Sequence, residues 1–120
     1  LEYAIRKIEK KETGRTWYLM NRKESILPGT LLYYQELVSR RKQRIPLQHL
    51  TGEQEFYGYP FYVNEHVLIP RQDTEVLVEE ALKRKKDGMK VLDLCTGSGC
   101  ILLSILKNLK QGTGVGIDIS

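Results

Sequence analysis

The chain has 120 residues, of which 41% are hydrophobic and 28% are charged, and its formal net charge is +4. This size suits one small domain, or a small module joined to part of a larger domain. No apolar run approaches the roughly 20 residues of a membrane-spanning helix, and the charged N-terminal stretch lacks the apolar centre of a signal peptide. A cytoplasmic protein is therefore expected.

The two cysteines and two histidines do not follow metal-ligand spacing. Cys95 and Cys100 have no accompanying second pair, and His49 and His66 stand alone. The sequence therefore predicts reduced thiols and no metal site.

Residues 1–52 are predicted to form a helical module. Apolar residues at helical spacing indicate a first helix that stops near Gly14, and "TWYLM" (16–20) is expected to form a short apolar turn. A second helix is expected with Thr30 as its N-cap, and a short third one between Pro46 and Gly52. The apolar positions of the first two helices are Leu1, Ala4, Ile5, Ile8, Leu31, Tyr34, Leu37 and Val38.

Residues 53–68 are predicted to form a β-hairpin. The stretch is rich in aromatic and β-branched residues and is interrupted by turn residues. Half of the aromatic side chains of the chain lie here, which would suit a joint between two packed bodies, although a packing role alone would explain them too. These side chains are Phe56, Tyr57, Tyr59, Phe61 and Tyr62.

From residue 69 onward the pattern is α/β. An amphipathic helix over 73–86, capped by Asp73 or Thr74, precedes a strand ("KVLDL"), a loop ("CTGSG"), a helix ("CILLSILKNL") and a strand ("VGIDI"). The buried face of the helix over 73–86 is expected to consist of Leu77, Val78, Ala81 and Leu82. This order predicts a parallel crossover, and two strands with one crossover helix indicate part of a larger α/β domain.

The glycine loop lies between a strand and a helix, where backbone N–H groups can face a ligand. A phosphate-binding P-loop is excluded because Cys100 and Ile101, not Lys and Ser/Thr, follow Gly99. A dinucleotide loop would want a third glycine at the position of Leu102. An S-adenosylmethionine loop needs neither feature.

Two carboxylates support the third alternative. Asp118 follows Gly99 at the end of the next strand, where a carboxylate can accept both ribose hydroxyls of a nucleoside. Asp93 lies near the end of the first strand and can orient the loop or reach the ammonium group of the cofactor. An empty α/β turn and a dinucleotide oxidoreductase remain as alternatives.

Two basic runs, at residues 40–44 and 83–86, each close a predicted helix, where cations complement the helix dipole. The first run could also contact a polyanion such as RNA.

The combination of "HLTG", "EFYG", "LIPRQDTE" and "VLDLCTGSG" closely resembles the HemK/PrmC family, the release factor glutamine methyltransferases. The resemblance covers residues from about 45 to 120. It implies a helical module (1–52) that recognises a peptide chain release factor, a hairpin linker (53–68), and the start of a Rossmann-like methyltransferase domain (69–120) that uses S-adenosylmethionine. A monomer without specific nucleic-acid binding is expected.

The resemblance also implies the cofactor residues, namely Cys95, Thr96, Gly97, Ser98, Gly99 and Asp118, with Asp93 beside them. The segment Ile69, Pro70, Arg71, Thr74 and Glu75 would form a lid, with Arg71 and Thr74 as its polar contacts. The family's catalytic Asn-Pro-Pro-Tyr motif does not occur in these 120 residues. No catalytic residue is therefore assigned, and this polypeptide alone is expected to be inactive.

Two rival functions remain. A nucleic-acid adenine methyltransferase uses a similar loop, and its target, the exocyclic amine of adenine, is a planar nitrogen like that of a glutamine amide. A non-catalytic docking fragment is the alternative outside enzymes.

Overall fold

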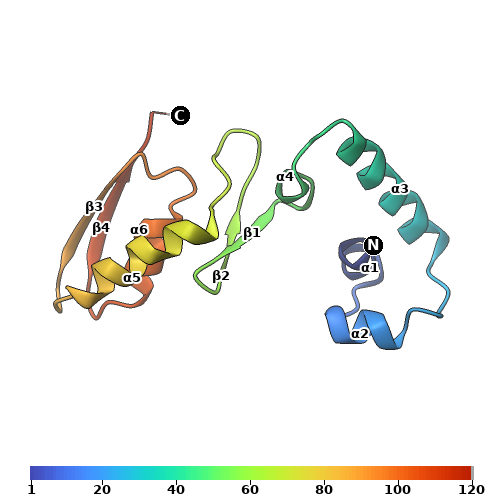
Figure 1. The fold of residues 1–120 in the computed structure, drawn as a ribbon, viewed down its shortest axis with the longest axis horizontal. Helices are drawn as coiled ribbons and strands as arrows, with labels where there is room; N and C mark the ends of the chain where they lie inside the picture. Colours follow the sequence, from blue (N-terminus) through green and yellow to red (C-terminus); the bar gives the residue numbers. More distant parts are fainter. Residues whose placement is uncertain (120) are drawn as a thin grey trace. The chain divides into compact units, whose positions relative to one another are not determined.

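A computed structural model describes residues 1–119, which form two compact units, unit 1 (Leu1–Thr51) and unit 2 (from Gly52 onward). The helices α1 to α4 come first, and two small two-stranded sheets, one antiparallel and one parallel, follow with the remaining helices (Figure 1). The predicted mixed α/β class is confirmed at this level.

Unit 1 consists of helices. They are α1 (Glu2–Glu9), α2 (Arg15–Met20), α3 (Pro28–Lys42) and α4 (Leu47–Thr51). Ala4 and Ile5, predicted apolar positions of the first helix, are buried, and so is Leu50 of α4. The predicted apolar positions Ile8 and Leu31 are instead exposed. The predicted short helix after Pro46 is confirmed, and Gly52 ends it in the left-handed region at φ +75°.

The prediction of a turn at "TWYLM" is wrong, because these residues belong to α2. Gly14 is extended before the helix, and the side-chain amide of Asn21 donates to the Trp17 carbonyl oxygen at 2.8 Å. This bond satisfies a carbonyl of the last turn. A helix of six residues is too short to show a helical period in the sequence.

The prediction of Thr30 as an N-cap is also wrong. Leu27 holds the cap position, Pro28 begins α3, and Thr30 is buried inside the first turn. The carboxylate of Glu9 accepts both the Thr30 hydroxyl (2.8 Å) and the Leu27 N–H (3.2 Å). The start of α3 is thus tied to a side chain of α1, and a local reading of the sequence misses this link.

Unit 2 begins with the predicted β-hairpin. β1 (Glu53–Phe56) and β2 (Tyr59–Tyr62) pair antiparallel, and the turn residues Tyr57 and Gly58 have φ values of +52° and +74°. Positive φ at both central residues is typical of the type I′ hairpin turn. Tyr57 therefore adopts a conformation that L-residues rarely favour.

The predicted parallel crossover is confirmed. β3 (Lys90–Leu94) and β4 (Thr113–Ile117) pair parallel, with Leu92 opposite Val115, and α6 (Cys100–Lys107) connects them (Figure 1). The last strand was expected over 115–119, but it begins and ends two residues earlier. Asp118 therefore lies just beyond the strand end.

The helix before β3 is shorter than expected. It comprises a 3-10 turn η1 (Gln72–Thr74) and α5 (Glu75–Lys83). Thr74 occupies the cap position without a side-chain cap bond, and its hydroxyl instead donates to Asp73 at 3.4 Å. Leu77, predicted to face inward, is exposed.

The core of unit 2 joins the hairpin to the helices. Phe56 and Phe61 meet edge to face, with ring centroids 6.2 Å apart, and they cluster with Val78, Cys100 and Ile105. An alternating set of apolar side chains on the two parallel strands is exposed. The set is Leu92, Leu94, Val115 and Ile117.

Candidate functional site

The loop between β3 and α6 adopts an unusual backbone. Cys95, Gly97 and Gly99 have φ values of +62°, +54° and +75°. Glycine adopts such angles without the steric cost that Cβ imposes on other residues. A Cβ at position 97 would make an ordinary van der Waals contact with Val67 at 3.6 Å, so the positive φ, rather than a lack of space, favours glycine there.

Both predicted acids hold this loop. The Thr96 hydroxyl donates to Asp93 at 2.8 Å, and the Gly97 N–H donates to the Asp118 carboxylate at 2.7 Å. The Thr96 N–H donates to the Ile117 carbonyl oxygen at 3.0 Å. The structure thus brings together residues that are far apart in the sequence, at the carboxyl ends of two parallel strands.

Part of the loop's donor capacity is used within the protein. The N–H groups of Thr96, Gly97 and Gly99 all donate to protein oxygens. The Asp118 carboxylate accepts the Gly97 N–H, and a carboxylate offers about four acceptor sites in all. The loop is therefore shaped before a ligand arrives.

Two glycines of β4 allow the loop and α6 to approach the strand. A Cβ at Gly116 would lie 2.9 Å from the Thr96 hydroxyl oxygen, and one at Gly114 would lie 2.6 Å from a methyl group of Leu102. The sequence reasoning did not use these glycines. Their spacing of two residues, which places both on one face of the strand, was the signal that could have found them.

An open hollow of about 520 Å³ borders the loop. It lies against Gly97 and Ser98 and so adjoins the glycine loop. Its other walls come from the hairpin, the segment after it and α6, a set that the sequence reasoning did not assign. These residues are Pro60, Phe61, Tyr62, Asn64, Val67 and Leu103.

The predicted lid segment does not line this hollow. Pro70 is buried, Arg71 is exposed, and Thr74 bonds to its neighbour Asp73. Glu75 accepts the Tyr57 N–H at 2.8 Å and so ties α5 to the hairpin turn. The Glu75 carboxylate thus holds the backbone of the hairpin turn.

The two thiols of the site differ. Cys95 is exposed, whereas Cys100 is buried at the start of α6, and burial raises the pKa of its thiol. The Cys100 thiol therefore stays protonated near neutral pH and is a poor nucleophile. Among residues 1–119, no group of three or more His, Cys, Asp or Glu side chains could hold a metal ion, and no helix is long and apolar enough to cross a membrane.

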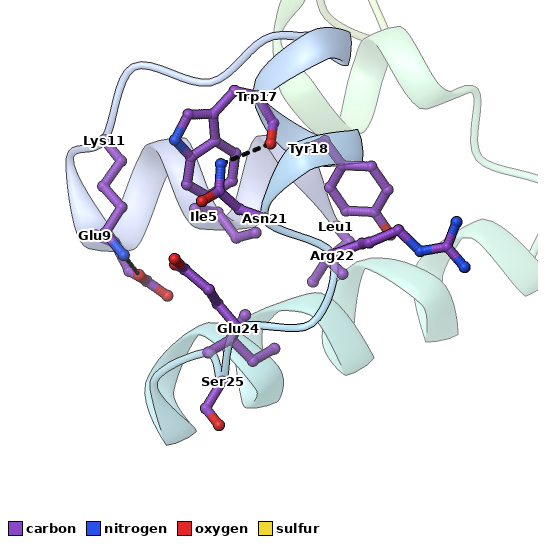
Figure 2. Close-up of a pocket in the computed structure, with 11 residues that line it drawn as sticks. Leu1, Ile5, Glu9, Lys11, Trp17, Tyr18, Asn21, Arg22, Glu24 and Ser25 are labelled. Carbon is purple, nitrogen blue, oxygen red and sulfur yellow. Dashed lines mark hydrogen bonds and ion pairs between the residues drawn. The ribbon is translucent and has the colours of Figure 1, made fainter.

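Unit 1 has a small mixed-charge hollow of about 50 Å³ between α1, α2 and the segment after α2 (Figure 2). Trp17 and Tyr18 reach it from α2, and Glu9 pairs with Lys11 at 2.9 Å on its rim. Groups of both signs line it, and its volume suits only one small group.

A second hollow of unit 1, of about 130 Å³, is mainly apolar and lies between α1, α3 and α4. We call it the α1–α3–α4 groove. Its lining residues are Leu1, Tyr3, Tyr34, Leu37, Val38, Arg41, Leu47, Leu50 and Thr51.

Comparison with known proteins finds a family model and several relatives that are similar to this chain. Residues 11–52 match the family model described as the PrmC N-terminal domain. Proteins named "release factor glutamine methyltransferase" are similar along most of the chain. One from Geobacter sulfurreducens is 44% identical over 88% of this chain and 37% of its own length. Others are from Clostridium acetobutylicum (38% identical; 100% and 41%) and Flavobacterium psychrophilum (43% identical; 75% and 33%).

A helical module followed by a parallel crossover with a glycine loop and two acids thus has relatives that carry a methyltransferase name. The chain belongs to the PrmC family. It spans between about a third and two fifths of the length of these curated relatives.

Proposed function

We propose that this chain is the cofactor-binding and substrate-recognition part of an enzyme that methylates a glutamine side-chain nitrogen in peptide chain release factors. The names of the relatives favour this function over a nucleic-acid adenine methyltransferase. Unit 2 would begin a Rossmann-like methyltransferase domain at residue 69. The helical module (1–52) would recognise the release factor, with the hairpin (53–68) as the linker.

The observation that carries the proposal is the hydrogen bond between Asp118 and the glycine loop. It places a carboxylate beside Gly97, at the edge of the hollow that the loop borders. A carboxylate in this position can accept ribose hydroxyls, which are the polar groups that S-adenosylmethionine shares with other nucleosides.

The residues around the loop fit S-adenosylmethionine. Gly97 borders the hollow, and Asp93 and Asp118 supply negative charge for a cofactor with a sulfonium and an ammonium group. Cys95, Thr96, Ser98 and Gly99 would complete the cradle. The cofactor supplies an electrophilic methyl group.

This chain binds and orients, but it lacks the group that performs the transfer. An amide nitrogen is a poor nucleophile because its lone pair is delocalised into the carbonyl. Acceptors must therefore grip the NH2 group and aim it at the methyl carbon. None of the residues that surround the loop is assigned this role, so the chain alone is expected to transfer no methyl group to a release factor.

Calorimetric titration of the chain with S-adenosylmethionine tests the proposal. Saturable binding is expected, and Asp118→Ala should abolish it. Asp118→Asn keeps an acceptor for the Gly97 N–H but loses the charge, so it should weaken binding while leaving the melting temperature nearly unchanged. Absence of binding by the unmodified chain would favour the docking fragment, and unchanged binding by Asp118→Ala would refute the ribose contact.

A further inference from the structure

We propose that the α1–α3–α4 groove of unit 1 binds a short protein segment that inserts one apolar side chain and places carboxylates beside the basic end of α3. This inference rests on the proposed recognition role of unit 1 and specifies the chemistry of the partner. It requires neither the cofactor nor methyl transfer.

The groove has apolar walls that present surface to solvent. Leu37 and Val38 of α3 are half-buried, and Leu47 at the start of α4 is 58% exposed. The buried Leu50 contributes to the lining as well. A hollow of about 130 Å³ with this lining suits a single large apolar side chain, which would release water from both surfaces.

Tyr3 of α1 forms the remaining wall of the groove, and a hydrogen bond holds its side chain in place. The Tyr3 hydroxyl donates to the Thr51 carbonyl oxygen at 3.0 Å, which links α1 to the end of α4. This bond satisfies the polar end of the Tyr3 side chain and leaves its ring as part of the lining. The groove is therefore held by contacts between three helices.

Positive charge stands at one end of the groove. Arg41 lies one helical turn after Leu37 and Val38, on the same side of α3, and it lines the groove. Its guanidinium donates to the Ile45 carbonyl oxygen at 3.3 Å, which holds it near the groove. Further exposed cations follow closely along the chain, namely Arg40, Lys42 and Arg44.

The charge is concentrated on this unit of the chain. Residues 1–51 contain eleven Lys and Arg against five Asp and Glu, a net charge of +6, whereas residues 52–120 carry a net charge of −2. The surface that adjoins the groove would therefore attract an acidic segment.

A protein segment fits better than a nucleic acid. A polyanion would need phosphate contacts only, and the apolar lining would then add nothing to its binding. An apolar anchor flanked by acids uses both features, in the manner of an amphipathic helix laid into a groove. The apolar lining and the cations at the end of α3 are adjacent, because Arg41 lines the groove and is also one of these cations.

The test uses a fluorescein-labelled 15-residue peptide with one central leucine and with glutamates that flank it on the same helical face. Anisotropy is measured with the chain in the absence of S-adenosylmethionine. Leu47→Asp and Arg41→Glu should each weaken binding about fivefold or more, the loss expected of an interface anchor. Lys23→Glu, an equal charge change at an exposed residue outside the groove, should have little effect.

Circular dichroism would verify that each variant is folded, and Leu47 and Arg41 are exposed enough for substitution to spare the core. Three results would overturn the proposal. These are no peptide binding, binding that Leu47→Asp leaves unchanged, or stronger binding of an oligouridylate of equal charge, which would indicate a polyanion site. If sedimentation showed that the chain forms a dimer and the dimer no longer bound the peptide, the groove would belong to a second copy of the chain, and the proposal would also be overturned. Failure of the cofactor titration would leave this result unaffected.

Discussion

The carboxylate of Glu75 is expected to stabilise unit 2 by holding the hairpin turn. Its Oε1 atom accepts the Tyr57 N–H at 2.8 Å in a partly buried setting. Tyr57 has a φ of +52°, so its backbone conformation needs support from its surroundings. Glu75→Ala removes that acceptor and also a negative charge from the first turn of α5, where the helix dipole favours it.

A hydrogen bond to a charged group contributes about 1.5–3 kcal/mol. Because water can reach this partly buried N–H and replace the lost acceptor, we expect a loss at or below the lower end of this range, about 1–2 kcal/mol. In a unit of this size that loss corresponds to a decrease in melting temperature of roughly 5–10 °C. Thermal denaturation followed by circular dichroism measures it.

Two matched variants make this test specific. Glu75→Gln keeps an acceptor for the Tyr57 N–H and should lose only part of the stability. Glu79→Ala removes an equal charge from an exposed position of α5 and should change the melting temperature little. If Glu75→Ala and Glu79→Ala melt alike, the bond contributes nothing measurable and the reasoning fails.

Three further predictions concern packing, acid and thiols. Gly114→Ala should lower the free energy of unfolding by about 1–3 kcal/mol, since its Cβ would meet a methyl group at 2.6 Å. Gly29→Ala has open space around it and should stabilise its helix. Urea denaturation measures both changes in unfolding free energy, and changes of the same sign would contradict the prediction. The pKa of Glu9 lies below its ordinary value of 4.5, first because of its hydrogen bond to Lys11 and then because of those to the start of α3. The contribution of Glu9 to the free energy of unfolding is therefore complete above about pH 4.5, and it is lost as the pH falls through the lowered pKa. Glu9→Gln should remove this part of the pH dependence of the unfolding free energy. Iodoacetamide should modify Cys95 faster than Cys100, and saturating S-adenosylmethionine should slow the Cys95 reaction, as mass spectrometry would show.

The sequence predicted elements whose signals are local. The strand "KVLDL" has the bounds that were expected, because an apolar run stands between an Asp-Gly turn and a glycine loop. The hairpin was similarly marked by aromatic residues on either side of Gly58. In both cases the residues that set the structure lie within a few positions of it.

The failures have the opposite cause. Thr30 was predicted to cap α3, but its hydroxyl instead donates to the Glu9 carboxylate, 21 residues earlier. The Gly97 bond to Asp118 also spans 21 residues, and the sequence placed the acid near the loop only through the rule that parallel strands end at one edge. The hollow beside the loop depends on Val67 and Asn64, for which no motif exists.

The arrangement around Thr96 explains why the glycine loop has this composition. Its hydroxyl is held by Asp93, its N–H by the carbonyl of Ile117, and its side chain fills the space that Gly116 leaves. These contacts come from the protein alone, so the loop does not need a ligand to adopt its shape. A ligand that binds a preformed loop avoids the entropy cost of ordering it. The acids beside the loop thus have two separable tasks: they fix its backbone, and under the proposed function they receive the cofactor, so a substitution that preserves the first task isolates the second.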